Sequence, residues 1–268
     1  MKGQSLAMGA FNAVFWRYVL GVAMMVPIYR PWRLRPPSGV VLRLHLWRSL
    51  AIALMVVLLF WGLARVPLAF GIGLSFVAPI LALLMAAVFF GEQVRLGVYA
   101  ASGIALAGVL VSVLGGGSRS AEMNNGVIAL LVASVLYAVN IVLQRRQAQL
   151  APALEIAFYQ NVMVLCCLCV PAPWWVTLPA TSMQWGIAAL CAVVAIIAVM
   201  LLAMAYSRTE TRVLVIVEYT AFIWAALFGW WLFAEIPTLH TMVGTALIIL
   251  GCLWSHFGNA ESRGRQNE

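Results

Sequence analysis

Apolar residues in this chain are grouped into segments of about 20 residues, which short polar or charged stretches separate. A helix of about 20 apolar residues crosses the hydrocarbon core of a bilayer and satisfies its own backbone hydrogen bonds there. The alternating strands that a membrane barrel requires do not occur. The pattern predicts an all-α polytopic membrane protein with about nine spans, at residues 10–29, 46–63, 68–90, 96–114, 126–143, 156–173, 185–206, 213–233 and 238–257.

The composition supports this prediction and limits the possible partners. Hydrophobic residues make up 65% of the 268 residues and charged residues only 9%, a balance that a soluble domain of this length does not need. The net charge of +8 comes from basic residues that lie mainly between the predicted spans. Because this placement follows the positive-inside rule, we expect the lipid bilayer, and not nucleic acid, as a partner.

The arginines also predict the orientation. With the long loop 30–47 in the cytoplasm, 12 of the 16 basic residues are cytoplasmic, and only Lys2, Arg65 and Arg119 lie on the opposite side, with Arg17 inside a span. The reverse orientation inverts this ratio and is disfavoured. We therefore expect a multi-pass protein of the cell inner (plasma) membrane with a cytoplasmic C-terminus.

The two halves of the chain align when one is shifted by 143 residues. The shift places Glu92 on Glu235 and Gly108 on Gly251. It predicts a first repeat over 1–116 without its opening helix, a linker over 117–125, a second repeat over 126–257 and a cytoplasmic tail over 258–268. Either the native chain starts upstream and supplies a tenth helix, or this member has nine spans. Five spans per repeat is an odd number, so we expect the two repeats to be inverted, as in many secondary transporters.

Glu218 is the first candidate for a functional residue. It lies in the otherwise uncharged run 213–233, which is long enough to cross a bilayer. A charged side chain at membrane depth is costly, and such residues usually face a bundle interior or a water-filled path. Glu218 could there bind a substrate cation or carry a proton. The alternative is that it reaches the headgroups from a helix end or stays protonated.

Other polar residues within the spans are few. Ser75 occupies the repeat position of Glu218, and Tyr137 and Asn140 are three residues apart and share a helix face. Pro79 removes a backbone hydrogen bond from the span that contains Ser75. The expected substrate-binding residues are Glu218, Tyr219, Tyr137, Asn140, Ser75 and Phe222, with Arg17 as a possible charge partner of Glu218. For each of them, ordinary hydrogen bonding between helices is the alternative.

The sequence contains no sign of an enzyme or a cofactor. It has no Asp, no HExxH motif and no glycine-rich phosphate loop, and its five cysteines lie in apolar segments where packing explains them better than a metal does. Glu92 and Glu235 each close a fourth span and are expected to cap the next helix or orient the loop, and not to touch substrate. The small residues of the fifth spans predict close helix packing, as scaffold or as the surface of a possible homodimer.

Two copies of a loose pattern at constant offset carry a resemblance to a known family. The first reads LSFVAPILALLMAAVFFGEQV followed by GIALAG, and the second VEYTAFIWAALFGWWLFAEIP followed by GTALIILG. The chain resembles EamA-type exporters of the drug/metabolite transporter (DMT) superfamily. The resemblance implies ten helices in two inverted repeats, and secondary transport by alternating access. The implied substrates are small organic metabolites such as amino acids, related metabolites or drugs, moved outward. A non-transporting membrane scaffold or assembly partner is the alternative.

Overall fold

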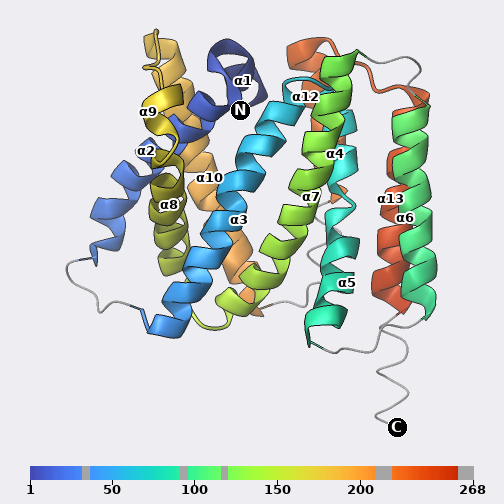
Figure 1. Ribbon diagram of the computed structural model, residues 1–268, viewed down its shortest axis with the longest axis horizontal. Coiled ribbons are helices and arrows are strands. Elements are labelled where there is room, and N and C mark those ends of the chain that lie inside the picture. Colours follow the sequence, from blue (N-terminus) through green and yellow to red (C-terminus); the bar gives the residue numbers. More distant parts are fainter. Residues whose placement is uncertain (32–36, 91–95, 116–119, 209–218, 259–268) are drawn as a thin grey trace. The chain divides into compact units, whose positions relative to one another are not determined.

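The computed structural model describes residues 1–31, 37–90, 96–115, 120–208 and 219–258, and every regular element within them is an α-helix (Figure 1). The predicted all-α class is therefore confirmed for this part of the chain. The helices are α1 (Lys2–Met8), α2 (Ala10–Tyr29), α3 (Gly39–Leu63), α4 (Leu68–Ser75), α5 (Ala78–Phe90), α6 (Leu96–Leu114), α7 (Ala121–Ala148), α8 (Ala153–Cys169), α9 (Ala172–Trp175), α10 (Ser182–Arg208), α12 (Ala221–Phe233) and α13 (Leu239–Gly258).

Four of these helices, α2, α3, α7 and α10, are long and apolar enough to cross a membrane by themselves. Shorter apolar helices accompany them in α4 with the start of α5, in α6, α8, α12 and α13. An all-helical chain with several such segments is a multi-pass membrane protein, because only helices and closed barrels satisfy the backbone within lipid.

The N-terminal boundary of α3 differs from the prediction. The sequence was expected to form a loop until residue 47, but the helix begins at Gly39, where the side chain of Ser38 accepts a hydrogen bond from the Val41 amide at 3.5 Å. The loop prediction is wrong here because Arg43 and His45 lower the local hydropathy, although the apolar residues between them continue the helix. As a result, three polar side chains that were assigned to a loop or its edge lie on a long helix.

The predicted span 68–90 is interrupted near its middle. Helix α4 ends at Ser75 and α5 begins at Ala78, because Pro79 has no N–H to donate to the carbonyl one turn earlier. The Phe76 amide bonds only three residues back, at 3.2 Å. The thiol of Cys252 on α13 donates to the Phe76 carbonyl at 3.2 Å, so a side chain from another helix supplies a partner at the interruption.

The helices form two compact units, and each unit takes segments from both halves of the chain. One contains α1, α2, α3, α8, α9, α10 and the C-terminal part of α7. Its core combines residues of α2, α3 and α8, among them Tyr18, Ile52 and Val164, which are at most 2% exposed. The other unit contains α4, α5, α6, α12, α13 and the N-terminal part of α7.

Helix starts recur at the offset that aligns the two halves of the sequence. Four pairs of helices, α2 with α8, α3 with α10, α5 with α12 and α6 with α13, begin 143 residues apart (10 and 153, 39 and 182, 78 and 221, 96 and 239). Helices therefore begin at equivalent positions in both halves of the chain.

In the second unit α6 and α13 pack through small residues and run antiparallel. A Cβ on Gly108 would lie 2.5 Å from the Gly244 carbonyl, and a Cβ on Gly251 would lie 2.6 Å from the Ala101 carbonyl. Gly108 and Gly251 are repeat counterparts, as are Ala101 and Gly244, so the same contact is made twice in opposite directions. Such close approach is possible only without side chains, which is the usual role of small residues between membrane helices.

We expect Gly108→Ala to destabilise the protein, because the added methyl group meets a backbone carbonyl that cannot rotate away. Overpacking of this kind costs about 1–3 kcal/mol. The matched control is Gly103→Ala on the same helix, where the added Cβ has no neighbour within 4 Å. Thermal unfolding in detergent compares the two variants, and equal unfolding temperatures would contradict the close α6–α13 contact.

Candidate functional site

The predicted site residues of the second unit gather only in part. Glu218 lies outside the described residues. Tyr219 is buried and its ring meets that of Phe76 edge-on, with 5.2 Å between centroids. The Ser75 hydroxyl donates to a backbone carbonyl one turn earlier in its own helix, at 3.1 Å. Phe222 is half-buried in the first turn of α12. The interruption after α4 therefore meets the residues just before α12 through the ring of Phe76, whereas the Ser75 hydroxyl bonds within its own helix.

The remaining predicted residues lie on α2 and α7. The Arg17 guanidinium carbon stands 4.1 Å from the centre of the Tyr18 ring, a cation–π distance, and the buried Arg17 Nε has no hydrogen-bond partner among the described residues. Tyr137 is half-buried in the part of α7 that belongs to the second unit, whereas Asn140 is buried in the part that belongs to the first. The two residues share a helix but belong to different units.

Asn140 leads to a buried polar network in the first unit that the sequence analysis did not predict. Arg48 of α3 is 3% exposed, and its Nε donates to Asn140 Oδ1 at 2.9 Å. Its Nη1 donates to Gln147 Oε1 at 2.7 Å, and Gln147 is fully buried. Within the described chain no carboxylate contacts this guanidinium, so two neutral amides of α7 hold the charge.

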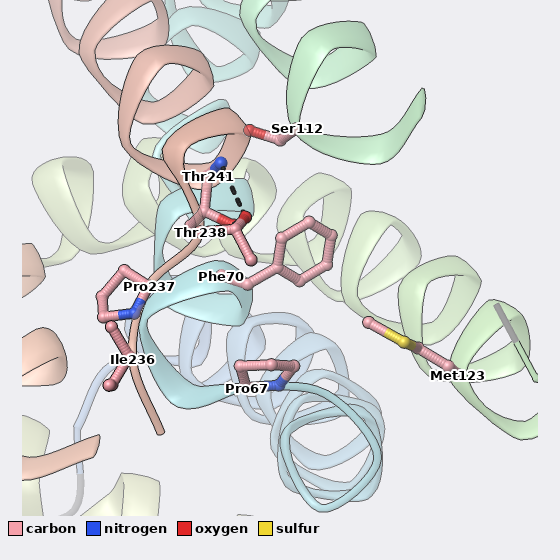
Figure 2. Close-up of a pocket in the computed structure, with 8 residues that line it drawn as sticks. All are labelled: Pro67, Phe70, Ser112, Met123, Ile236, Pro237, Thr238 and Thr241. Carbon is pink, nitrogen blue, oxygen red and sulfur yellow. Dashed lines mark hydrogen bonds between the residues drawn. The ribbon is translucent and has the colours of Figure 1, made fainter. Parts of the chain in front are cut away.

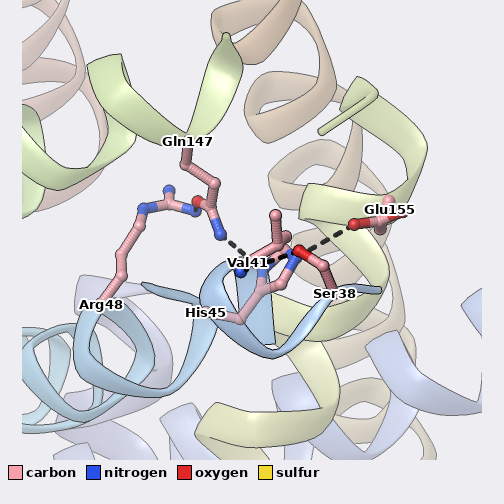
Figure 3. Close-up of polar contacts among 6 residues, drawn as sticks. All are labelled: Ser38, Val41, His45, Arg48, Gln147 and Glu155. Atoms are coloured by element: carbon pink, nitrogen blue, oxygen red, sulfur yellow. Dashed lines mark hydrogen bonds and ion pairs between the residues drawn. The ribbon is translucent and has the colours of Figure 1, made fainter. Parts of the chain in front are cut away.

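The network continues from Gln147 to α8 (Figure 3). The Gln147 amide nitrogen bonds His45 Nδ1, and His45 Nε2 lies 3.3 Å from Glu155 Oε1. His45 is 1% exposed, and its ring stacks on Tyr159 with 4.8 Å between centroids. A continuous chain of polar contacts thus connects α7, α3 and α8.

The direction of each hydrogen bond follows from the donors available. Because Gln147 Oε1 accepts from Arg48, its NH₂ group faces His45 Nδ1, which must then be an unprotonated acceptor. The single imidazole proton is on Nε2 and points to Glu155. A second proton on Nδ1 would require the Gln147 amide to turn, and that turn would remove its oxygen from Arg48. Protonation of His45 and the Arg48–Gln147 bond therefore exclude each other.

The network runs from the first turn of one helix into the interior of another. Glu155 is in the first turn of α8, whereas Arg48 is the tenth residue of α3, about 14 Å along the helix from its start. Ionisable residues inside spans are costly and usually mark substrate or ion pathways. The arrangement can hold an anion at Arg48 or move a proton between His45 and Glu155.

A sequence signal for this network exists but was not used. Asn140, Gln144 and Gln147 are spaced four and three residues apart, which places three amides on one face of α7, and all three are buried. His45 and Arg48 are likewise three apart on α3. Polar residues at helical spacing within an apolar context predict a buried polar face, even where hydropathy alone predicts a loop.

The second unit contains a small cavity of about 80 Å³ between α4, α6 and α13 (Figure 2). Its wall includes Phe70 and the hydroxyls of Ser112 and Thr241. Beside it the Glu235 carboxylate accepts from the Leu68 amide at 2.7 Å and so caps α4. Glu235 was expected to cap the next helix, and that prediction is wrong about the helix, because the carboxylate caps α4 from another part of the chain. The cavity is well below the usual volume of a metabolite pocket, about 300–1,000 Å³.

Comparison with known proteins adds the family. The model of the EamA-like transporter family matches residues 1–114 and 124–257. The chain belongs to the EamA-like transporter family. The resemblance found in the sequence is thereby confirmed, and family membership points to a membrane transporter rather than an enzyme.

Two curated relatives of this EamA-like chain have the same name. They are the pseudopaline exporters CntI of Pseudomonas aeruginosa strains UCBPP-PA14 and PAO1, each 26% identical over 259 residues, with 94% of this chain and 88% of the relative covered. A solved crystal structure matches with a TM-score of 0.64 at 20% identity, covering 94% of this chain and 88% of the other. That likeness concerns the fold alone.

We expect Gln147→Leu to destabilise this EamA-like protein, because it leaves donors of Arg48 and the acceptor of His45 buried without partners. An unsatisfied buried polar group costs about 1–3 kcal/mol, and more when it is charged. Gln149→Leu is the matched control, since Gln149 is exposed two residues further along. Denaturant unfolding of both variants tests the network, and an equal loss of stability in the two would argue against it.

Proposed function

We propose that this protein is a secondary transporter, and specifically an exporter, of small organic metabolites such as amino acids, related metabolites or drugs. It works in the cell inner membrane with its C-terminus in the cytoplasm. Support comes from the family and from relatives whose name states that they export pseudopaline. The identity of 26% supports the transport class and does not carry the substrate over, because fold and family host many substrates.

The observation that carries the proposal is the buried network of Arg48, Gln147 and His45 in helices long enough to span a membrane. A structural ion pair would join opposite charges, but Arg48 is held by neutral amides. A guanidinium on amide partners can exchange them for a carboxylate or another anion, to which its bonds are stronger. In this proposal Arg48 binds an anionic group of the substrate, and His45 with Glu155 takes up a proton.

Alternating access in such families relies on inverted repeats. Support for inversion comes from α6 and α13, which are repeat counterparts, run antiparallel and contact each other reciprocally. A second pair agrees with it, since Asn161 of α8 contacts Gly21 of α2, and the counterparts of these two residues, Tyr18 and Val164, share one core cluster. Antiparallel counterparts are the relation that two inverted repeats produce.

The substrate-binding residues expected from the sequence stay part of the proposal. Glu218 is proposed either to bind a substrate cation or to carry a proton, with Arg17 as its possible charge partner. Substrate contacts are proposed for Ser75, Tyr137, Asn140, Tyr219 and Phe222. For Asn140 the bond to Arg48 adds support, since it connects a predicted binding residue to the buried charge.

Export assays test the role of Arg48. Proteoliposomes containing the protein are loaded with a panel of amino acids, related metabolites, nucleosides and drugs, and the efflux of each is followed. For transported anions we expect Arg48→Gln to lower the rate about 10- to 100-fold, as loss of a charged hydrogen bond of about 1.5–3 kcal/mol implies. Arg48→Lys keeps the positive charge but loses the planar guanidinium. Its efflux rate should lie between those of the unmodified protein and Arg48→Gln.

Arg30→Gln serves as the matched control, because Arg30 is exposed at the end of α2 and its Nε donates to a carbonyl of its own helix. Its efflux rate should equal that of the unmodified protein. Efflux from Arg48→Gln at the unmodified rate would remove Arg48 from the mechanism. Absence of efflux for every compound of the panel would count against the transport proposal itself.

The proton role of Glu218 makes a separate prediction. Desolvation favours the neutral form of a carboxyl group at membrane depth, so Glu218 is a second candidate, beside His45 with Glu155, for the group that carries the coupled proton. If Glu218 is that group, Glu218→Gln should abolish the response to an applied pH gradient while substrate exchange across the membrane continues. Glu122→Gln, in the exposed first turn of α7, is the control. An unchanged response in Glu218→Gln would assign coupling to another group.

A further inference from the structure

A groove on the first unit combines positive charge with apolar walls. It encloses about 310 Å³ between the first turns of α3 and the last turns of α7. Arg43 and Arg146 contribute guanidinium groups from the two helices, and Leu44, Trp47 and Leu143 contribute apolar surface. The groove is separate from the buried network of Arg48, whose residues do not line it.

The two arginines share this groove without any compensating charge. None of the lining residues is acidic. Both side chains are exposed, and neither makes a hydrogen bond or ion pair within the described part of the chain. Two like charges in one groove repel each other, and an anion between them converts that repulsion into two favourable contacts.

The apolar walls indicate what kind of anion fits. Trp47 is 64% exposed and the aliphatic side chains extend the wall beside the cations. A free inorganic anion stays hydrated and gains nothing from such a wall. An amphiphile with an anionic headgroup can contact the arginines with its headgroup and the apolar wall with its hydrocarbon chain. Trp residues gather at the level of lipid headgroups, and basic pockets between membrane helices hold anionic headgroups.

We propose that this groove binds an anionic phospholipid. Arg43 and Arg146 contact the headgroup phosphate, and one acyl chain lies along Leu44, Trp47 and Leu143. The bound lipid bridges α3 and α7, which are also the helices that Arg48 and Gln147 join. Occupancy of the groove therefore stabilises the contact between these two helices.

The experiment measures the thermal stability of the purified full chain in detergent during titration with phosphatidylglycerol. We expect a saturable rise in unfolding temperature, with no such rise for phosphatidylcholine or for inorganic phosphate. Arg43→Gln combined with Arg146→Gln should weaken the apparent affinity for phosphatidylglycerol roughly 30-fold, since each basic residue near an anionic lipid surface contributes about a fivefold effect. Equal unfolding temperatures in phosphatidylcholine show that the double variant is folded.

Arg145→Gln is the matched control, because Arg145 is exposed, adjacent in sequence and absent from the groove wall. It should retain most of the affinity. Equal weakening by Arg145→Gln would show that general surface charge attracts the lipid, and would overturn the proposed site. An equal rise in unfolding temperature with inorganic phosphate would identify a site for free anions. An equal rise with phosphatidylcholine would show that the groove does not distinguish anionic from zwitterionic lipids. Either result overturns the proposal.

Discussion

A guanidinium buried between helices must find its hydrogen-bond partners within the protein. Arg48 of α3 is 3% exposed, and a buried charge without partners is costly. It meets this constraint through two amides of α7, and the second of them is also tied to His45 and, through it, to Glu155 on α8. The demand of one buried charge thus holds three helices in register.

The second unit is assembled under a different constraint. Lipid tails are as apolar as leucine, so no hydrophobic force brings membrane helices together, and close van der Waals packing must do so. Glycines at the α6–α13 crossing allow the backbones to approach until a single methyl group would clash. Hydrogen-bonded polar side chains join α3 to α7 and α8 in the first unit. In the second unit, α6 and α13 are joined by close backbone contact at glycines.

A transporter needs polar groups that can change partners, and the network of the first unit contains them. The Gln147 amide serves Arg48 with its oxygen and His45 with its nitrogen, so a proton arriving at His45 Nδ1 competes with the bond to Arg48. Within the proposed function, this competition is a physical means by which proton uptake and anion binding influence each other. It requires only the rotation of one side chain.

The sequence by itself determined the all-α membrane class of the protein and its family, and it predicted the offset at which helix starts recur. These are local properties: hydropathy is additive along a segment, and Pro79 or Ser38 acts on its nearest backbone neighbours. Contacts between distant segments needed the tertiary structure. Hydropathy assigned Arg48 and His45 to a loop or its edge because it weighs each residue against its sequence neighbours, but side chains from α7 and α8, about a hundred residues away, decide whether they are buried. Glu235 likewise was recognised as a capping residue, whereas the helix that it caps, α4, is fixed only by how α4 and α12 pack.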